Sequence, residues 1–259
     1  MQIKKIILLS MIICCTCVSI HGQTNTVAQT LQEIYQNYDS LKYLSFDVKF
    51  DYGSDTLLGK YDAEQMDATY TLAGKKAIYR MGDIDFMQND SFLIAVYNRD
   101  KLIVVDEPKA INVGSQLPMR SMLDSLLLAY GNDYTMNRYT QGSDTGVIQM
   151  DRSDSSAQFD HFRLQYDVNT KMLYSLSYEF TQQADLDTVV INSWMTSNGS
   201  SVPPSQKKRL TVRFLHYRFD NYDESLYDEN KYIWFENGMC KPVTKYEDYK
   251  IYYNKPVVD

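Results

Sequence analysis

The sequence predicts a mainly β protein of the α+β class, in which antiparallel strands are accompanied by two helices. Apolar and polar residues alternate through Phe162–Val168 and Met172–Phe180, which is the period of antiparallel strands with one face on a core. Only two stretches carry apolar residues at helical spacing. Tyrosine, which favours half-exposed strand positions, occurs 22 times against 10 phenylalanines and 2 tryptophans.

Residues 1–22 are expected to be a secretory signal peptide. Lys4 and Lys5 precede an apolar run from Ile6 to Ile13, and Gly22 is the small residue at which we expect cleavage. The run is shorter than the ~20 residues that a membrane-spanning helix needs. The sequence therefore predicts an exported, periplasmic chain that begins at Gln23.

The cysteines of this signal keep a lipid anchor at the outer membrane open as the alternative, although none of Cys14, Cys15 and Cys17 follows the small residue of a lipoprotein signal. Cleavage leaves only Cys240, so no internal disulfide is expected. Cleavage also changes the formal net charge from −7 to −9, because Lys4 and Lys5 are removed. Such an acidic chain is not expected to bind nucleic acid.

The mature chain is expected to fold as a single domain, residues 23–259. Its first helix is predicted over Thr26–Leu41, and the second follows Pro118 and ends before Gly131. Before the second helix, strands are predicted at Leu44–Tyr52, Leu57–Gln65, Thr69–Ala73, Lys76–Met81, Ser91–Asn98 and Leu102–Asp106, with a hairpin over Gly82–Asp90. After it, strands are predicted at Tyr134–Tyr139, Thr145–Asp151, His161–Val168, Met172–Phe180, Leu186–Met195, Arg209–Phe219, Lys231–Phe235 and Tyr249–Tyr253.

Two neighbouring strands, Phe92–Tyr97 and Leu102–Val105, are apolar on both faces and must be covered on both sides. We expect the first helix to cover one face, and the second helix or a ligand to cover the other. A sheet with a helix across its mouth encloses a cavity for an apolar ligand, and methionine suits a movable lid. The candidate ligand-binding residues are Phe92, Ile94, Val96, Leu102, Val104, Met119, Met122, Leu123, Leu126 and Leu127. The alternative is that the second helix only caps the core.

Residues typical of catalysis are few. His161 and His216 are expected at the surface, and no nucleophile motif surrounds Cys240. Asp83 and Asp85 share a strand face that suits a hard cation, but solvated acids are the expected case there. The acidic loop from Asp220 to Glu229 lacks calcium-hand spacing and is expected to be solvated. No cofactor or metal is predicted, and the protein is not expected to be an enzyme.

The order of elements resembles the LolA/LolB-like periplasmic lipoprotein carriers, especially the divergent forms of Bacteroidetes-type bacteria. The resemblance is carried by the helix with Tyr35, Tyr38 and Leu41, and by the segments Leu44–Phe50, Gly59–Tyr61, Lys75–Met81, Phe92–Val96, Leu102–Asp106 and Asp167–Lys171. It implies an incomplete antiparallel β-barrel, closed on its open side by the N-terminal helix and a mid-chain lid helix. The resemblance further implies that this fold holds lipoprotein acyl chains in transit to the outer membrane.

The function predicted from these features is a non-enzymatic periplasmic carrier for lipoprotein acyl chains or another hydrophobic ligand. An alternative is a structural or interaction module of the cell envelope, which would present a tyrosine-rich sheet face to envelope proteins. A hydrolase that uses paired carboxylates is the third hypothesis. The tail from Ser197 onward is longer and richer in tyrosine than the family pattern.

Overall fold

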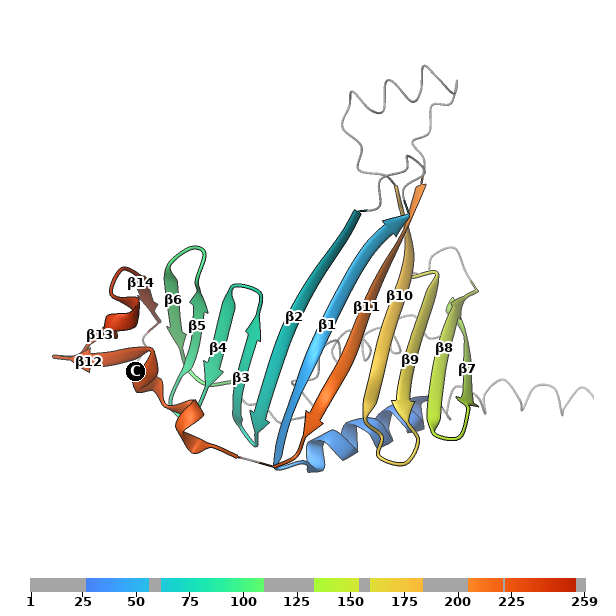
Figure 1. Cartoon of the computed structure of the whole chain (residues 1–259), viewed down its shortest axis with the longest axis horizontal. Coiled ribbons are helices and arrows are strands. Elements are labelled where there is room, and N and C mark those ends of the chain that lie inside the picture. Colours follow the sequence, from blue (N-terminus) through green and yellow to red (C-terminus); the bar gives the residue numbers. More distant parts are fainter. Residues whose placement is uncertain are drawn as a thin grey trace, which may run out of the picture. The chain divides into compact units, whose positions relative to one another are not determined.

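The computed structural model describes residues 27–55, 62–109, 133–153, 159–183, 205–220 and 222–254. Within these residues the fold is mainly β, with one α-helix over residues 27–40, as the sequence predicts (Figure 1). The expected signal peptide, the second helix and the strand Leu186–Met195 lie outside the described residues. The chain divides into two compact units, which are described in turn.

The first unit contains residues 27–36 of the helix and the described residues from 133 to 209. Its strands hydrogen-bond in the order β7-β8-β9-β10, followed by the first residues of β11. The strands are β7 (Tyr134–Gln141), β8 (Thr145–Arg152), β9 (His161–Asp167), β10 (Leu173–Gln183) and β11 (Ser205–Arg218). Val27, Leu31 and Ile34 of the helix are buried, which confirms the predicted apolar stripe.

Alternation holds in β9 but breaks in β10. Phe162, Leu164 and Tyr166 are all buried, as predicted. Along β10 the register shifts between Leu173 and Ser175, a β-bulge that turns Tyr174 outward, 38% exposed. The Tyr174 hydroxyl donates to Asp167 Oδ2 at 2.7 Å. Tyr166, by contrast, is fully buried and belongs to the core, although tyrosine was expected at half-exposed strand positions.

The second unit contains Asn37–Gly53, the described residues from Ala63 to 109, and those from Leu210 to 254. Its strands hydrogen-bond in the order β14-β6-β5-β4-β3-β2-β1, followed by the rest of β11. The strands are β1 (Tyr43–Asp55), β2 (Asp62–Ala73), β3 (Lys76–Met81), β4 (Ile84–Gln88), β5 (Leu93–Tyr97), β6 (Leu102–Asp106) and β14 (Lys250–Tyr253). Within the described part of this unit, β14 is an edge strand.

Two strand predictions in this unit differ from the structure. The hairpin expected over Gly82–Asp90 contains a full strand, β4, which pairs with both β3 and β5. Asp83 and Asp85 alternate with apolar Ile84 and Phe86, and the prediction assigned these two acids to the mouth of a hairpin rather than to a strand. The strands expected at Leu57–Gln65 and Thr69–Ala73 are, in their described part, the single strand β2.

The tail of the chain forms a compact segment, residues 222–254, which we call the C-terminal segment. It contains the 3-10 helices η3 (Glu224–Tyr227), η4 (Glu229–Lys231) and η5 (Thr244–Tyr246), and a hairpin of β12 (Ile233–Glu236) and β13 (Met239–Pro242). Asn237 and Gly238 close the hairpin with φ angles of 50° and 76°, the left-handed region that a two-residue turn requires. The predicted strand Lys231–Phe235 therefore begins two residues later, after η4.

Candidate functional site

Strands β3 to β6 have two faces, and their register assigns each side chain to one of them. Tyr79 pairs with Phe86, Phe86 with Ala95, and Ala95 with Val104, so these four side chains share one face. We call it the ladder face. Ile94 pairs with Val105 and Val96 with Ile103, which places these four on the opposite side. We call that side the covered face.

The ladder face carries a row of stacked aromatic rings across four strands. Phe46 stacks on Tyr70 with centroids 5.1 Å apart, Tyr70 on Tyr79 at 5.3 Å, and Tyr79 on Phe86 at 4.0 Å. Burial decreases along the row, from fully buried Phe46 to half-buried Tyr79 and Phe86. Burial also raises the pKa of Tyr70 and Tyr79 above the usual tyrosine range, so both hydroxyls stay neutral at physiological pH.

Beyond Phe86 the row continues as aliphatic side chains. Ala95 and Val104 extend it over β5 and β6, and Leu93 and Leu102 flank them on the same face. Leu93, Leu102 and Val104 are half-buried. Such a surface offers dispersion contacts to an alkyl chain or a ring.

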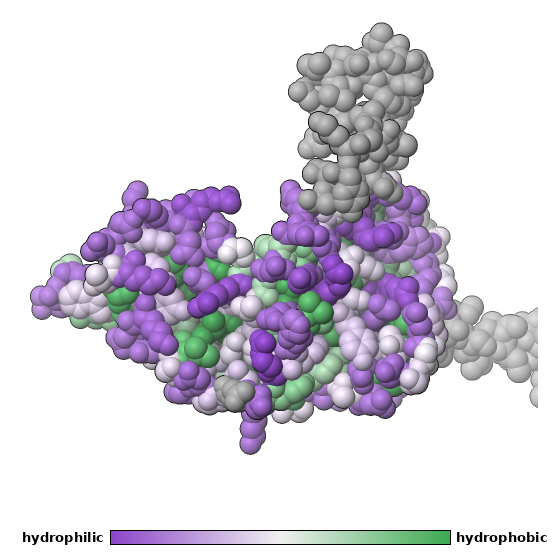
Figure 2. Space-filling model, in the orientation of Figure 1, coloured by the Kyte–Doolittle hydropathy of each residue, from purple (hydrophilic) through white to green (hydrophobic). Residues whose placement is uncertain are grey.

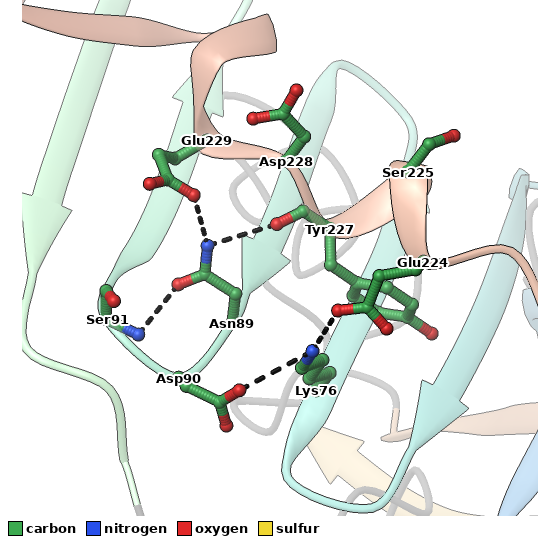
Figure 3. A pocket seen from close by; sticks show the side chains of 9 residues that line it. All are labelled: Lys76, Asn89, Asp90, Ser91, Glu224, Ser225, Tyr227, Asp228 and Glu229. Atoms are coloured by element: carbon green, nitrogen blue, oxygen red, sulfur yellow. Dashed lines mark hydrogen bonds and ion pairs between the residues drawn. The ribbon is translucent and has the colours of Figure 1, made fainter.

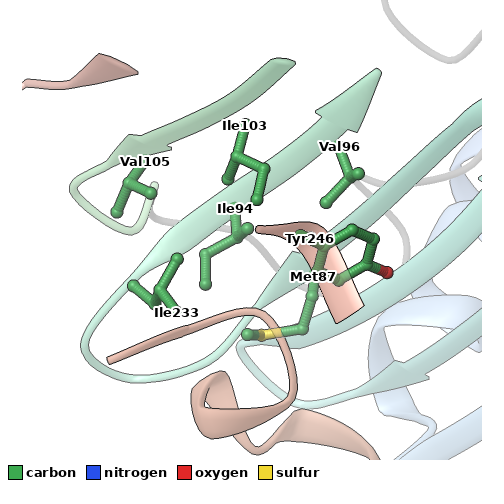
Figure 4. Packing of buried hydrophobic residues seen from close by; sticks show 7 residues of the cluster. All are labelled: Met87, Ile94, Val96, Ile103, Val105, Ile233 and Tyr246. Atoms are coloured by element: carbon green, nitrogen blue, oxygen red, sulfur yellow. The ribbon is translucent and has the colours of Figure 1, made fainter. Parts of the chain in front are cut away.

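The covered face packs against the C-terminal segment. Met87, Ile94, Val96, Ile103 and Val105 form one fully buried cluster with Ile233 and Tyr246 of that segment (Figure 4). Tyr246 is 3% exposed and Ile233 is fully buried. The cover of this face is therefore the tail, whereas the sequence led us to expect the first helix on one face and the second helix or a ligand on the other.

Asn89 fixes the C-terminal segment to the turn between β4 and β5 (Figure 3). Its side-chain nitrogen donates to the carbonyl oxygen of Tyr227 at 3.0 Å and to Glu229 Oε2 at 2.7 Å. Its side-chain oxygen accepts the backbone N–H groups of Ser91 and Phe92 at 2.9 and 2.8 Å. Because Asn89 is only 8% exposed, these four bonds replace water for a buried amide.

A second anchor lies beside the first. Lys76 pairs with Glu224 of η3 and lies 3.5 Å from Asp90, and the hydrogen bond to Glu224 raises the pKa of Lys76. Asp223 and Asp228 cap η3 and η4 through their side chains. The acidic loop is therefore structured and attached to β3 and β4, while its Asp223 and Glu224 are exposed, as predicted.

The structure divides the candidate ligand-binding residues between the two faces. Ile94 and Val96 lie in the buried cluster of the covered face, and Phe92 packs against that cluster with its ring 5.5 Å from Phe235. Leu102 and Val104 lie on the ladder face. The remaining five, Met119, Met122, Leu123, Leu126 and Leu127, lie outside the described residues.

Sequence reasoning missed Tyr79 and Phe86, which dominate the ladder face. Tyr79 follows Ala77, and Phe86 follows Ile84, by two residues. This spacing indicates a shared strand face and could have identified both rings. It remained hidden because β4 was not recognised as a strand. The two rings come together because β3 pairs with β4, and the sequence pattern does not predict which strands pair.

The histidines and aspartates considered for catalysis or metal binding lie in ion pairs or hydrogen bonds at the surface. His161 Nδ1 lies 2.7 Å from Asp151 and His216 Nδ1 2.7 Å from Asp47, and both histidines are exposed, as predicted. Asp85 lies 3.3 Å from Arg80, and Asp83 lies 3.4 Å from Arg99.

Cys240 packs against the covered-face cluster, where burial raises the pKa of its thiol, the opposite of what an activated nucleophile needs. Across the residues that the structure describes, no three His, Cys, Asp or Glu side chains are placed to hold a metal ion.

Exposed apolar side chains concentrate near the C-terminus. The face seen in Figure 2 is largely hydrophilic, with small separate hydrophobic areas. Among the described residues, the exposed large hydrophobic side chains from this part of the chain are Phe219, Tyr222, Leu226, Trp234, Phe235, Met239 and Tyr252. No described helix is both long enough and apolar enough to span a membrane.

Comparison with known proteins gives distant structural likenesses. No protein-family model and no curated protein matches the sequence. An uncharacterized conserved protein from Thermus thermophilus is 8% identical, with a TM-score of 0.41, and the match covers 86% of this chain and 99% of that one. A LolA superfamily protein from Nitrosomonas europaea is 10% identical, with a TM-score of 0.22 over 77% and 97% of the two chains. A chain of the MucA/MucB complex of Pseudomonas aeruginosa is 11% identical, with a TM-score of 0.32 over 83% and 62%.

Proposed function

We propose that this protein is a non-enzymatic carrier that binds a hydrophobic, acyl-bearing ligand on the ladder face. The observation that carries the proposal is that β5 and β6 are apolar on both sides, while the C-terminal segment covers only one of them. Strands of this kind need a cover on each face. Half-buried Tyr79, Phe86, Leu102 and Val104 on the ladder face provide the contact surface for the ligand.

The chain leaves β6 on the side of the ladder face, and this supports a second wall for the site. Gln88 shares the face of Phe86, is 1% exposed and clamps Lys109. Its side-chain nitrogen donates to the Lys109 carbonyl oxygen at 2.9 Å, and its oxygen accepts the Lys109 N–H at 3.1 Å. In this proposal the predicted helix with Met119, Met122, Leu123, Leu126 and Leu127, which follows Lys109, closes over the ligand.

The cellular role that fits is transport of lipoprotein acyl chains in the periplasm, in the manner of the LolA/LolB-like carriers. The predicted signal peptide and the acyl-compatible face support this role. The ladder face offers mainly apolar side chains and neutral tyrosine hydroxyls, which suit binding of an apolar ligand.

Native mass spectrometry of the mature chain purified from bacterial cells, followed by lipid extraction, tests the proposal. We expect mass increments that correspond to acyl-bearing lipids. The paired substitutions Leu102→Gln and Val104→Thr keep side-chain volume, add polarity to the face and should remove most of the bound lipid. Leu226→Gln changes an exposed leucine of η3 and should leave the lipid in place. Absence of lipid, together with no binding of a fluorescent fatty acid by the unsubstituted protein, would contradict the proposal.

An interaction module of the envelope is the second candidate, and the exposed apolar side chains of the C-terminal segment favour it. Trp234 and Met239 share one face of the β12–β13 hairpin and are 41% and 58% exposed. Deleting the tail cannot test this function, because Ile233 and Tyr246 belong to the core. The double substitution Trp234→Ser and Met239→Ser should remove partners from envelope pull-downs if this function holds, and unchanged partners would reject it.

A further inference from the structure

Strand β14 differs from its neighbours in direction and position. The strands from β2 to β6 pair antiparallel, whereas β14 adds to the edge of β6 in parallel, with Lys250 opposite Leu102 and Tyr253 opposite Val105. Backbone bonds fix this register: the Lys250 N–H donates to the Lys101 carbonyl oxygen at 2.8 Å, and the Asn254 N–H donates to that of Val105 at 3.0 Å. Strand β14 therefore extends the sheet at the edge of β6, in the way that an extended peptide extends a sheet in a strand-addition complex.

The strand is held weakly by its side chains. None of its four residues is buried, and Tyr252 is 64% exposed. In β5 the three central residues are buried. Strands with few buried side chains open locally at much lower free energy than the core. We therefore expect β14 to detach while the rest of the unit stays folded.

The chain before β14 has its own anchors, which make such detachment local. Tyr246 is buried in the covered-face cluster, the Tyr249 hydroxyl donates to Asn98 Oδ1 at 3.1 Å, and Asp248 pairs with Lys101. These contacts stay in place when residues from Lys250 onward move. What opens is the edge of β6 and the two places filled by Ile251 and Tyr253 beside the cluster.

We propose that the edge of β6 is an acceptor for an extended peptide of a partner protein, and that β14 occupies this edge in cis until the partner displaces it. The peptide runs parallel to β6. It carries large apolar side chains at two positions two residues apart, which replace Ile251 and Tyr253 beside the covered-face cluster. Its backbone N–H groups at the positions of Lys250 and Asn254 bond to Lys101 and Val105. This acceptor edge is separate from the proposed ladder-face site and does not depend on it.

A labelled synthetic peptide with the sequence of residues 249–254 is the probe, measured by fluorescence anisotropy against the full chain and its Ile251→Asp variant. The variant weakens the strand that competes in cis and leaves β6 intact, so it should bind the peptide about tenfold more tightly. N-methylation of the peptide at the position of Lys250 removes a bond to β6 and should abolish binding. N-methylation at Ile251 should be tolerated, because alternate N–H groups of a strand point to opposite edges.

Three results would overturn the proposal. The first is no binding of the unmodified peptide to a variant whose circular dichroism matches that of the parent chain. The second is equal loss of binding from both methylations, which would exclude strand addition. The third is a peptide-independent dimer of the parent chain in light scattering, which would assign the edge to strand exchange between copies. Hydrogen exchange on the unsubstituted chain adds a check that needs no variant: equal protection of β14 and β5 would exclude local opening.

Discussion

Replacing Asn89 by alanine should weaken the attachment of the C-terminal segment to β4 and β5. The substitution removes four hydrogen bonds, and it leaves the N–H groups of Ser91 and Phe92 and the carbonyl oxygen of Tyr227 without this partner. A hydrogen bond contributes about 1 kcal/mol net, and buried groups left unpaired cost more. We expect the free energy of unfolding to fall by about 3 kcal/mol, which a domain of ordinary stability survives.

Urea unfolding followed by circular dichroism measures the loss, and hydrogen exchange locates it. Protection should fall in residues 222–254 and in the β4–β5 turn. Asn230→Ala is the matched control, because Asn230 is exposed and its side chain bonds only to Asp228 within the same loop. It should cost less than about 0.5 kcal/mol. If Asn89→Ala is as mild as Asn230→Ala, Asn89 does not hold the segment and the reasoning fails.

The remaining predictions concern single sites. Gly146→Ala should destabilise the protein by about 2 kcal/mol, because a Cβ there would lie 2.3 Å from Cζ of fully buried Tyr166; thermal unfolding measures this, and adding Tyr166→Leu should recover part of the loss. Hydrogen bonds from the Thr170 backbone and the Tyr174 hydroxyl lower the pKa of Asp167 to about 2. Asp167→Asn should therefore lower stability at pH 7, and its difference from the parent chain should shrink as the pH falls from about 4 to about 2; a difference that stays constant with pH would refute this. In the mature chain, the Cys240 thiol should react with a thiol reagent at pH 8 more slowly than free cysteine, and urea should abolish the delay, since burial raises its pKa.

The periodic parts of the fold could be predicted from sequence, since burial imposes its period directly on the chain. The helix stripe of Val27, Leu31 and Ile34 and the alternation of Phe162, Leu164 and Tyr166 are such cases. The bulge before Ser175 could not be predicted, because the extra residue of a bulge looks like any other strand residue in the sequence. It nevertheless turns the Tyr174 side chain to the other face of the sheet.

The site was only partly predictable for a related reason. Two doubly apolar strands showed that both faces must be covered, but sequence does not say which distant segment supplies the cover. Ile233 and Tyr246 are far from Ile94 in the sequence. A contact between such distant segments leaves no periodic pattern in either of them. Ile94 and Leu102 were therefore grouped together, although strand register places them on opposite faces.

Methyl NMR during a titration with a medium-chain fatty acid tests the ladder-face proposal most directly. The two faces alternate along the same strands, so each strand carries its own control. We predict shifts for the methyl groups of Leu93, Leu102 and Val104, and little change for those of Ile94, Ile103 and Val105 beneath the C-terminal segment. Shifts confined to the covered face, or no shifts at saturating fatty acid, would contradict binding at the ladder face.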